Sequence, residues 1–254
     1  MPHVLGIAVL VGVLGAVFGS FLNVVIHRLP RGESLLAPRS HCTACGTPVK
    51  ARDNVPVVAW VWLRGRCRAC RATISWSYPL VEVGTAGLCV AVVLTRSSAA
   101  GVALGLVLVL SLVPTAVIDV EHHIIPNRIT LPAALAALVL GSTLDPAGEP
   151  ARLIAAAAAG GFLLLAHLVS PRGMGMGDVK LAGLLGLVLG REVAPAMLAA
   201  LVLAVAVGVV VLLRADPAER RRAGLPFGPF LALGALVGLF AGHAILGAYL
   251  HHLA

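Results

Sequence analysis

The chain has 254 residues, of which 59% are hydrophobic and only 12% charged, and its formal net charge is +8. About a quarter of the residues of an average soluble protein are charged, so this composition excludes an ordinary soluble domain and indicates several membrane spans. The net positive charge does not indicate nucleic-acid binding. Only 4% of the residues are aromatic, which leaves few rings for base stacking, and basic residues collect in the cytoplasmic loops of membrane proteins.

Eight apolar segments are the candidate spans, and they predict an all-α, multi-pass membrane protein with about eight transmembrane helices. Six of the segments are close to the ~20 residues that a spanning helix needs, and two, 129–143 and 179–190, are short. The first segment has no Lys or Arg before it and no small-residue cleavage site after it, so we expect it to be a retained span rather than a signal peptide. The segments are 4–26, 77–95, 99–118, 129–143, 153–170, 179–190, 193–213 and 228–250.

The basic residues predict the orientation of these spans. If the N-terminus lies outside and all eight segments cross, the outer loops hold only Arg96, Arg152 and Arg191, and the other 16 of the 19 Lys and Arg are cytoplasmic. If segment 179–190 did not cross, the cluster Arg220–Arg222 would lie outside, against the positive-inside rule. We therefore expect a protein of the cytoplasmic membrane with its N-terminus outside, embedded in the lipid bilayer.

The polar segment between the first two spans contains two Cys-x-x-Cys pairs. We divide the chain into a first transmembrane helix (1–26), a cytoplasmic loop domain (27–76) and a seven-helix membrane core (77–254). The pairs are Cys42 with Cys45 and Cys67 with Cys70, separated by 21 residues. This is just beyond the usual spacing of zinc ribbons, and four thiolates form the closed tetrahedral shell that structural Zn²⁺ prefers.

Two disulfides are the alternative for these four cysteines. The cytosol is reducing, which argues against disulfides in this loop. A segment of about 50 residues also cannot bury a large core, so we expect a bound metal ion to stabilise its fold. We therefore predict structural zinc, and not catalytic zinc, because four thiolates leave no coordination position open. The fifth cysteine, Cys89, lies within a span and is expected to be a buried apolar residue.

Two aspartates are predicted at the cytoplasmic edge of the membrane. Asp119 ends the third span, and Asp178 begins the sixth, directly after the alternating glycines Gly173, Gly175 and Gly177. A carboxylate beside hydrocarbon is costly, and two at one depth could activate water for peptide hydrolysis, one ionised and one protonated. The glycines would let an extended substrate backbone come close and would tolerate unusual dihedral angles.

Structural roles for both aspartates remain open. Asp178 could be a helix cap that satisfies backbone N–H groups, and Asp119 could be an interfacial residue paired with Arg128 or with a nearby histidine. Glu121, in the same loop as Asp119, is an alternative acid. A transporter is a second possible function, because the short segments 129–143 and 179–190 could flank a substrate site. A zinc-bearing scaffold without enzymatic activity is a third.

The ordered set of motifs resembles the prepilin peptidases, a family of intramembrane aspartic proteases of the Gly-x-Gly-Asp class. The resemblance covers nearly the whole chain and includes both cysteine pairs. The matching segments are Gly19–Pro30, Pro38–Cys42, Asp53–Pro56, Leu63–Cys70, Tyr78–Glu82, Ile118-Asp119 with Ile125–Asn127, Gly175–Leu181 and Pro226–Phe230.

The resemblance implies a protease that cuts type IV prepilins and pseudopilins on the cytoplasmic side, after a glycine that ends a short basic leader. It implies that Asp119 and Asp178 are the catalytic pair, that Gly175 and Gly177 belong to the active-site loop, and that the four cysteines bind a metal. It also implies methylation of the new N-terminus with S-adenosylmethionine, although no motif for that cofactor is readable. Many relatives carry Asp at the positions of Glu121 and Asn127, and both differences could alter the local field.

Overall fold

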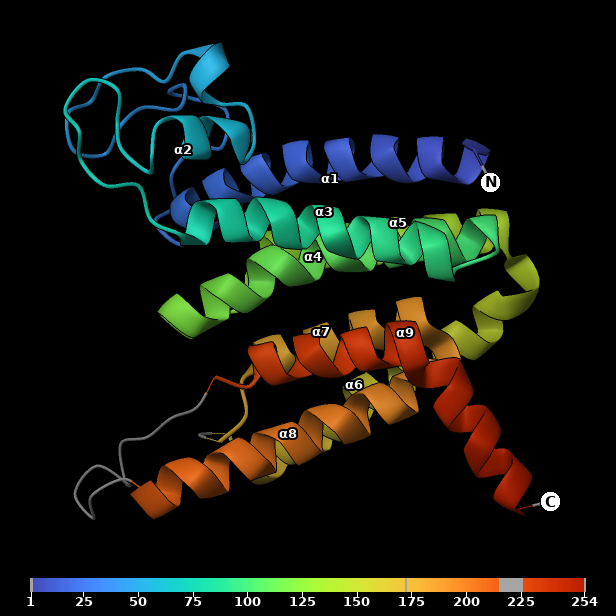
Figure 1. Ribbon diagram of the computed structural model, residues 1–254. Coiled ribbons are helices and arrows are strands. Elements are labelled where there is room, and N and C mark those ends of the chain that lie inside the picture. Colours follow the sequence, from blue (N-terminus) through green and yellow to red (C-terminus); the bar gives the residue numbers. More distant parts are fainter. Residues whose placement is uncertain (1, 172, 215–225, 254) are drawn as a thin grey trace. The chain divides into compact units, whose positions relative to one another are not determined.

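The computed structural model describes residues 2–171, 173–214 and 226–253, and in these residues the secondary structure is helical, with two isolated β-bridges and no strand. The predicted all-α class is therefore confirmed. The chain forms two compact units, Met1–Ser98 and Ala99–Ala254, and Figure 1 shows the helices of each. The first unit contains α1 (Pro2–Arg28), the 3₁₀ turn η1 (Ala51–Asp53), α2 (Val58–Trp62) and α3 (Ser77–Thr95).

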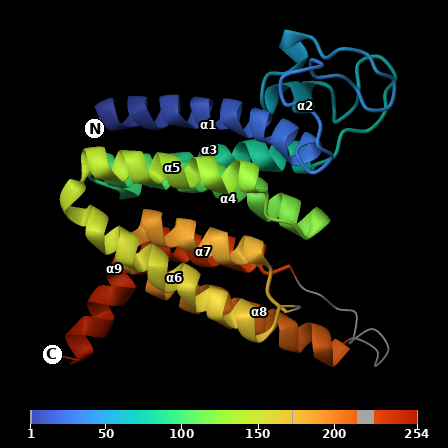
Figure 2. The same cartoon turned by 180° about the vertical axis from the view of Figure 1, so that it is seen from behind.

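The described residues of the second unit form six α-helices and two 3₁₀ turns. These are α4 (Ala99–His122), α5 (Asn127–Leu144), η2 (Pro146–Gly148), α6 (Glu149–Val169), α7 (Met176–Leu189), η3 (Gly190–Glu192), α8 (Val193–Arg214) and α9 (Gly228–Leu253). Figure 2 shows the same helices from behind. The division at residues 26 and 76 that the sequence suggested stays a prediction.

Seven stretches among the described residues are long and apolar enough to cross a membrane, so the protein is a multi-pass membrane protein. One of them, 39 residues long, contains both α7 and α8, and the chain reverses between these helices at η3 (Figures 1 and 2). The short α7 has 14 residues and is about 21 Å long. The cluster Arg220–Arg222, which supported the predicted orientation, lies outside the described residues.

In the first unit, α1 and α3 pack at backbone contact distance. A Cβ added to Gly19 would lie 2.7 Å from the Cα of Glu82, and one added to Gly15 would lie 2.9 Å from the Cα of Ala86. Membrane helices associate through such small residues, because apolar surface alone gives no advantage over lipid. The Asn23 side chain donates a hydrogen bond to the backbone carbonyl of Tyr78 (3.1 Å) and fixes the register of the pair.

In the second unit, α7 contacts α4, α5, α6, α8 and α9. From Leu181 onward it is apolar around its whole circumference, as expected of a helix that protein surrounds, and Leu181 and Leu185 are fully buried. Small residues again permit a close approach of the backbones, because a Cβ on Gly186 of α7 would overlap the Cα of Ala156 on α6. The buried position of α7 holds its first turn, and with it Asp178, in a fixed place.

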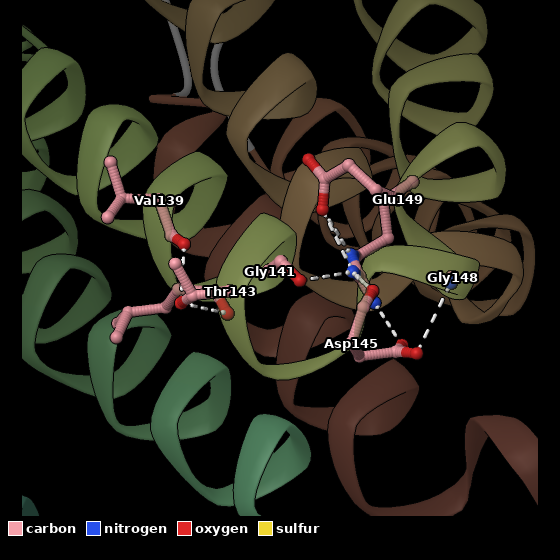
Figure 3. Close-up of polar contacts among 8 residues, drawn as sticks. Val139, Gly141, Thr143, Asp145, Gly148 and Glu149 are labelled. Carbon is pink, nitrogen blue, oxygen red and sulfur yellow. Dashed lines mark hydrogen bonds and ion pairs between the residues drawn. The ribbon is translucent and has the colours of Figure 1, made fainter.

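A buried charge cluster closes the turn between α5 and α6 (Figure 3). The Arg152 guanidinium donates to Asp145 Oδ2 (2.6 Å), to Glu149 Oε2 (2.8 Å) and to the backbone carbonyl of Gly141 (3.1 Å). Arg152 is 8% exposed and Glu149 is 9% exposed. The cluster, formed by these four residues, lies at the opposite end of α5 from Asn127 and joins the two helices there.

Candidate functional site

Asp119 lies on the last turn of α4 and is only 5% exposed. Its Oδ2 accepts a hydrogen bond from the backbone N–H of Gly228 (2.9 Å), the first residue of α9. The first N–H groups of a helix have no partner within the helix and attract negative charge. The carboxylate lies so close to the backbone of Gly228 that no side chain has room there, since a Cβ on Gly228 would lie 2.6 Å from Asp119 Oδ2.

Asp178 lies on the first turn of α7 and is 8% exposed. Its Oδ2 accepts a hydrogen bond from the backbone N–H of Gly175 (3.1 Å), so this oxygen caps the start of the helix. Its Oδ1 is buried without a protein partner. A buried oxygen without a partner is costly, and a role as a helix cap does not account for it, because the cap uses only Oδ2.

Three contacts bring the segments around these aspartates together. Helices α4 and α7, which carry Asp119 and Asp178, pack on each other. Gly177 lies against Ile125, because a Cβ on this glycine would be 2.7 Å from the Ile125 Cβ. Lys180 Nζ donates to Asn127 Oδ1 (2.9 Å), which ties α7 to the start of α5. Residues 59 positions apart in the sequence thus form one buried acidic site.

The two glycines of the predicted active-site loop have different structural roles. Gly175 has an ordinary extended backbone (φ −76°, ψ 143°), so it does not need the conformational freedom of glycine, although a Cβ there would approach Asp178 Oδ2 to 3.0 Å. Gly177 is required by space, because Ile125 fills the position of its side chain. The absence of side chains, and not unusual dihedral angles, explains these glycines.

The alternative acid Glu121 has a different environment. Its side chain is 52% exposed, and its Oε2 lies 3.9 Å from Nε2 of His122. Sequence reasoning missed the contacts of Gly228, Ile125 and His167. The His167 side chain bonds to the backbone carbonyl of Met174 (2.7 Å) and so anchors the glycine segment to α6. Of these three contacts, only that of Gly228 had a possible signal in the sequence, the Pro-Phe-Gly-Pro-Phe motif at 226–230. The motif does not reveal which residue Gly228 contacts.

The contact between Gly228 and Asp119 leads to a first prediction. Gly228→Ala should lower the second-order rate constant for substrate cleavage by about a hundredfold, because the added methyl group displaces the Asp119 carboxylate by a large fraction of an ångström. The measurement is kcat/KM with purified protein. Gly247→Ala is the matched control on the same helix, since nothing lies within 4 Å of a Cβ there. Equal activity of both variants would contradict the assigned role of Gly228.

The four cysteines of the loop could hold a metal ion. Their sulfur atoms all lie within 4.8 Å of one another, and Cys42 and Cys70 have their sulfurs 3.8 Å apart. Zn–S bonds of ~2.3 Å in a tetrahedron place the sulfurs ~3.8 Å apart, so the cluster is close to the geometry that zinc requires. No disulfide links the cysteines of the described chain.

The two knuckles have the same backbone turn. In each, the first cysteine accepts a hydrogen bond at its carbonyl from the residue four positions later, Gly46 (2.9 Å) or Arg71 (3.1 Å). Both residues have positive φ, 70° and 61°. Each knuckle contributes two thiol groups, and four thiolates are the donor set of closed structural Zn²⁺ sites. The cluster therefore has both the shape and the donor chemistry of a metal site.

An ion pair joins the second knuckle to the segment after the first. Arg68 donates to both carboxylate oxygens of Asp53 through Nε and Nη2, at 2.6 to 3.1 Å. Such bidentate pairs fix geometry as well as adding energy. Asp53 follows the first knuckle by eight residues, so the pair holds the two halves of the loop together.

Two family profiles match this chain. Residues 13–96 match the bacterial peptidase A24 N-terminal domain, and residues 106–213 match the type IV leader peptidase family. A protein of Aeromonas hydrophila named prepilin leader peptidase/N-methyltransferase is 35% identical, and the alignment covers 95% of this chain and 93% of the relative. Proteins of the same name from Burkholderia pseudomallei (strain 1026b) and Myxococcus xanthus are each 37% identical.

The coverage of the last two alignments is also high. It is 91% of this chain and 84% of the Burkholderia protein, and 87% of this chain and 69% of the Myxococcus protein. No solved structure matches the chain. The relatives are named as enzymes, so the comparisons favour neither a transporter nor a scaffold.

Proposed function

The chain belongs to the type IV leader peptidase family, and on this basis we propose that it is an intramembrane aspartic endopeptidase that removes the leader from prepilins and pseudopilins. The observation that carries the proposal is the pair of buried carboxylates at one end of the second unit, Asp119 from α4 and Asp178 from α7. The two come from different helices, and both side chains are more than nine-tenths buried, at 5% and 8% exposed.

The proposed reaction is hydrolysis of the peptide bond after a glycine. One carboxylate of the pair takes a proton from water as the water oxygen attacks the scissile carbonyl carbon, and the other, protonated, donates a hydrogen bond to the carbonyl oxygen. The C–N bond then breaks, and the leaving amine receives a proton from the pair. The two protonation equilibria belong to the pair and not to either residue alone.

The proposed orientation places this pair at the cytoplasmic side of the inner membrane, with the N-terminus outside. The excess of basic residues in the loops on that side supports it. A prepilin presents its basic leader in the cytosol and its hydrophobic helix in the bilayer. The scissile bond would then lie near the interface, at the depth of Asp119 and Asp178.

We propose that the metal held by Cys42, Cys45, Cys67 and Cys70 is structural Zn²⁺. The support is the number and type of donors and the sulfur distances. The metal would close the loop domain, and no chemical step involves it.

We also propose that the protein methylates the new N-terminal amine with S-adenosylmethionine. The support is the name N-methyltransferase that the relatives carry. Residues 2–171, 173–214 and 226–253 contain no strand, and so no strand–turn–helix of the kind that binds nucleotides in dinucleotide-binding folds. No residue of this chain is assigned to that cofactor.

The test of the proposed function is a processing assay with a prepilin that has glycine before the cut. Detergent-purified protein should convert it to the mature form, and mass spectrometry of the mature N-terminus should find one added methyl group when S-adenosylmethionine is supplied. A substrate with Ala in place of that glycine should be cut at least tenfold more slowly, because glycine unwinds the helix locally. No cleavage of the glycine substrate by folded, zinc-loaded protein would refute the proposal.

A further inference from the structure

A groove in the first unit is used by neither the proposed protease site nor the metal centre. It has a volume of about 520 Å³ and lies between the second half of α1 and the loop domain. Val17, Phe21 and Val24 form its wall on α1, and Leu36 and Arg39 belong to its wall on the loop. Val17 and Phe21 are 52% and 46% exposed on a helix that can span the membrane. The groove therefore begins at hydrocarbon depth and ends in the polar loop.

A buried arginine builds the loop side of this groove. Arg28, the last residue of α1, is 7% exposed. Its guanidinium donates to the backbone carbonyls of Ser34 (2.9 Å) and Pro38 (2.8 Å). These bonds hold segment 34–38 over the end of α1, so the groove is a fixed part of the unit.

The net charge of the loop indicates that a ligand of this groove is anionic. Segment 27–76 contains nine Lys and Arg against the acidic residues Glu33 and Asp53, a net charge of +7. Arg39 is exposed at the groove. A basic prepilin leader would be repelled by this surface, whereas an anionic headgroup would be attracted, by about fivefold in affinity for each basic residue near it.

Apolar side chains of the same loop indicate that it rests on the bilayer surface. Helix α2 exposes Val58, Val61 and Trp62, the last at 78%. The Trp60 ring packs on Trp76 with 4.0 Å between the ring centroids, and Trp76 directly precedes the span α3. Tryptophan is enriched where membrane helices pass the headgroup layer. The loop is thus at the level of the lipid headgroups.

We propose that the groove binds one anionic phospholipid of the bilayer. An acyl chain would lie along Val17, Phe21 and Val24, and the phosphate would lie toward Arg39. This site is independent of the protease proposal, because none of its residues belongs to the aspartate pair or to the metal cluster.

The test is lipid binding to the full-length, zinc-loaded protein in non-ionic detergent, measured by native mass spectrometry. Phosphatidylglycerol and phosphatidylcholine with the same acyl chains are added separately. We expect one phosphatidylglycerol to be retained at least fivefold more tightly than phosphatidylcholine. Arg39→Gln should remove most of this difference, a loss of about fivefold. Val17→Trp, which fills the apolar end, should weaken the binding of both lipids.

Two matched control variants distinguish binding in the groove from general electrostatic attraction of lipid to the basic loop. Arg66→Gln removes the same charge from an exposed position of the loop that does not line the groove, and Val13→Trp adds the same side chain one turn earlier on α1, at a position 59% exposed. Both should bind phosphatidylglycerol as the unaltered protein does, and glycerol 3-phosphate without acyl chains should not compete. Equal retention of the two lipids, equal effects of Arg39→Gln and Arg66→Gln, or displacement of the lipid by a prepilin leader peptide would overturn the proposal.

Discussion

Replacing either aspartate by asparagine is expected to reduce prepilin processing by at least about a thousandfold. Asn keeps the size of Asp119 or Asp178 and can still accept the hydrogen bond from Gly228 or Gly175, but it cannot take a proton from water or hold one for the carbonyl. Positioned acid–base groups contribute about 10² to 10⁴ in rate. The measurement is the initial cleavage rate of each purified variant, with zinc content and elution volume as checks of folding.

Glu121→Gln is the matched control for this prediction. It removes a carboxylate from the same helix end, but from a side chain that is 52% exposed and lies 3.9 Å from His122. We expect it to retain cleavage within a few-fold. If Asp119→Asn or Asp178→Asn cleaves at the unaltered rate, or if Glu121→Gln is the inactive variant, the dyad is wrongly assigned.

The second large effect is expected at the metal centre. Cys→Ser at 42, 45, 67 or 70 should lower the zinc content from one per chain to near zero after dialysis against a chelator, because a hydroxyl is a poor replacement for a thiolate. Structural zinc contributes an apparent ~10 to 16 kcal/mol in zinc-finger peptides, so the loop should lose its fold with the metal. Elemental analysis measures the first effect, and limited proteolysis within 27–76 measures the second.

Cys89→Ala is the control for these variants. This thiol is 3% exposed within α3 and lies outside the cysteine cluster, so its replacement should leave the zinc content unchanged. Clean protein that carries no zinc, or cysteine variants that keep it, would contradict the assignment of the cluster as a zinc site.

Much of the fold could be predicted from the sequence, because a helix that spans a bilayer must be a long run of mainly apolar residues. Runs of apolar residues predicted all the helices that are candidate spans. For the short α7, the distribution of Lys and Arg was the reason to include segment 179–190 among them. The spacing of the two Cys-x-x-Cys pairs predicted that their sulfurs could share one metal ion. These predictions depend on local patterns, and the helices carry such patterns without reference to their neighbours.

The partners of the site residues could not be predicted, since they depend on how the helices pack. Gly228 donates to Asp119 across 109 positions of sequence, and a motif rich in Pro and Phe gives no sign of this contact. Gly177 could be explained by backbone freedom or by lack of space. Only the position of Ile125 decides between them.

Asp178 illustrates why the structural and chemical explanations of one residue need not compete. The sequence left open whether it caps a helix or carries out chemistry. In the structure its Oδ2 caps α7 through Gly175, and its Oδ1 has no protein partner. A carboxylate has two oxygens, and the hydrogen bond to the first holds the second in a defined direction.

The cluster around Arg152 has a consequence for how the second unit can move. It joins α5 to α6 at the end of α5 that is farthest from Asn127, and η3 lies close by, with Gly190 near the aliphatic part of Arg152. At the other end, the helices are tied by single hydrogen bonds such as that between Lys180 and Asn127. We therefore expect any separation of these helices to be smallest at the ionic end and largest at the end that carries Asp119 and Asp178.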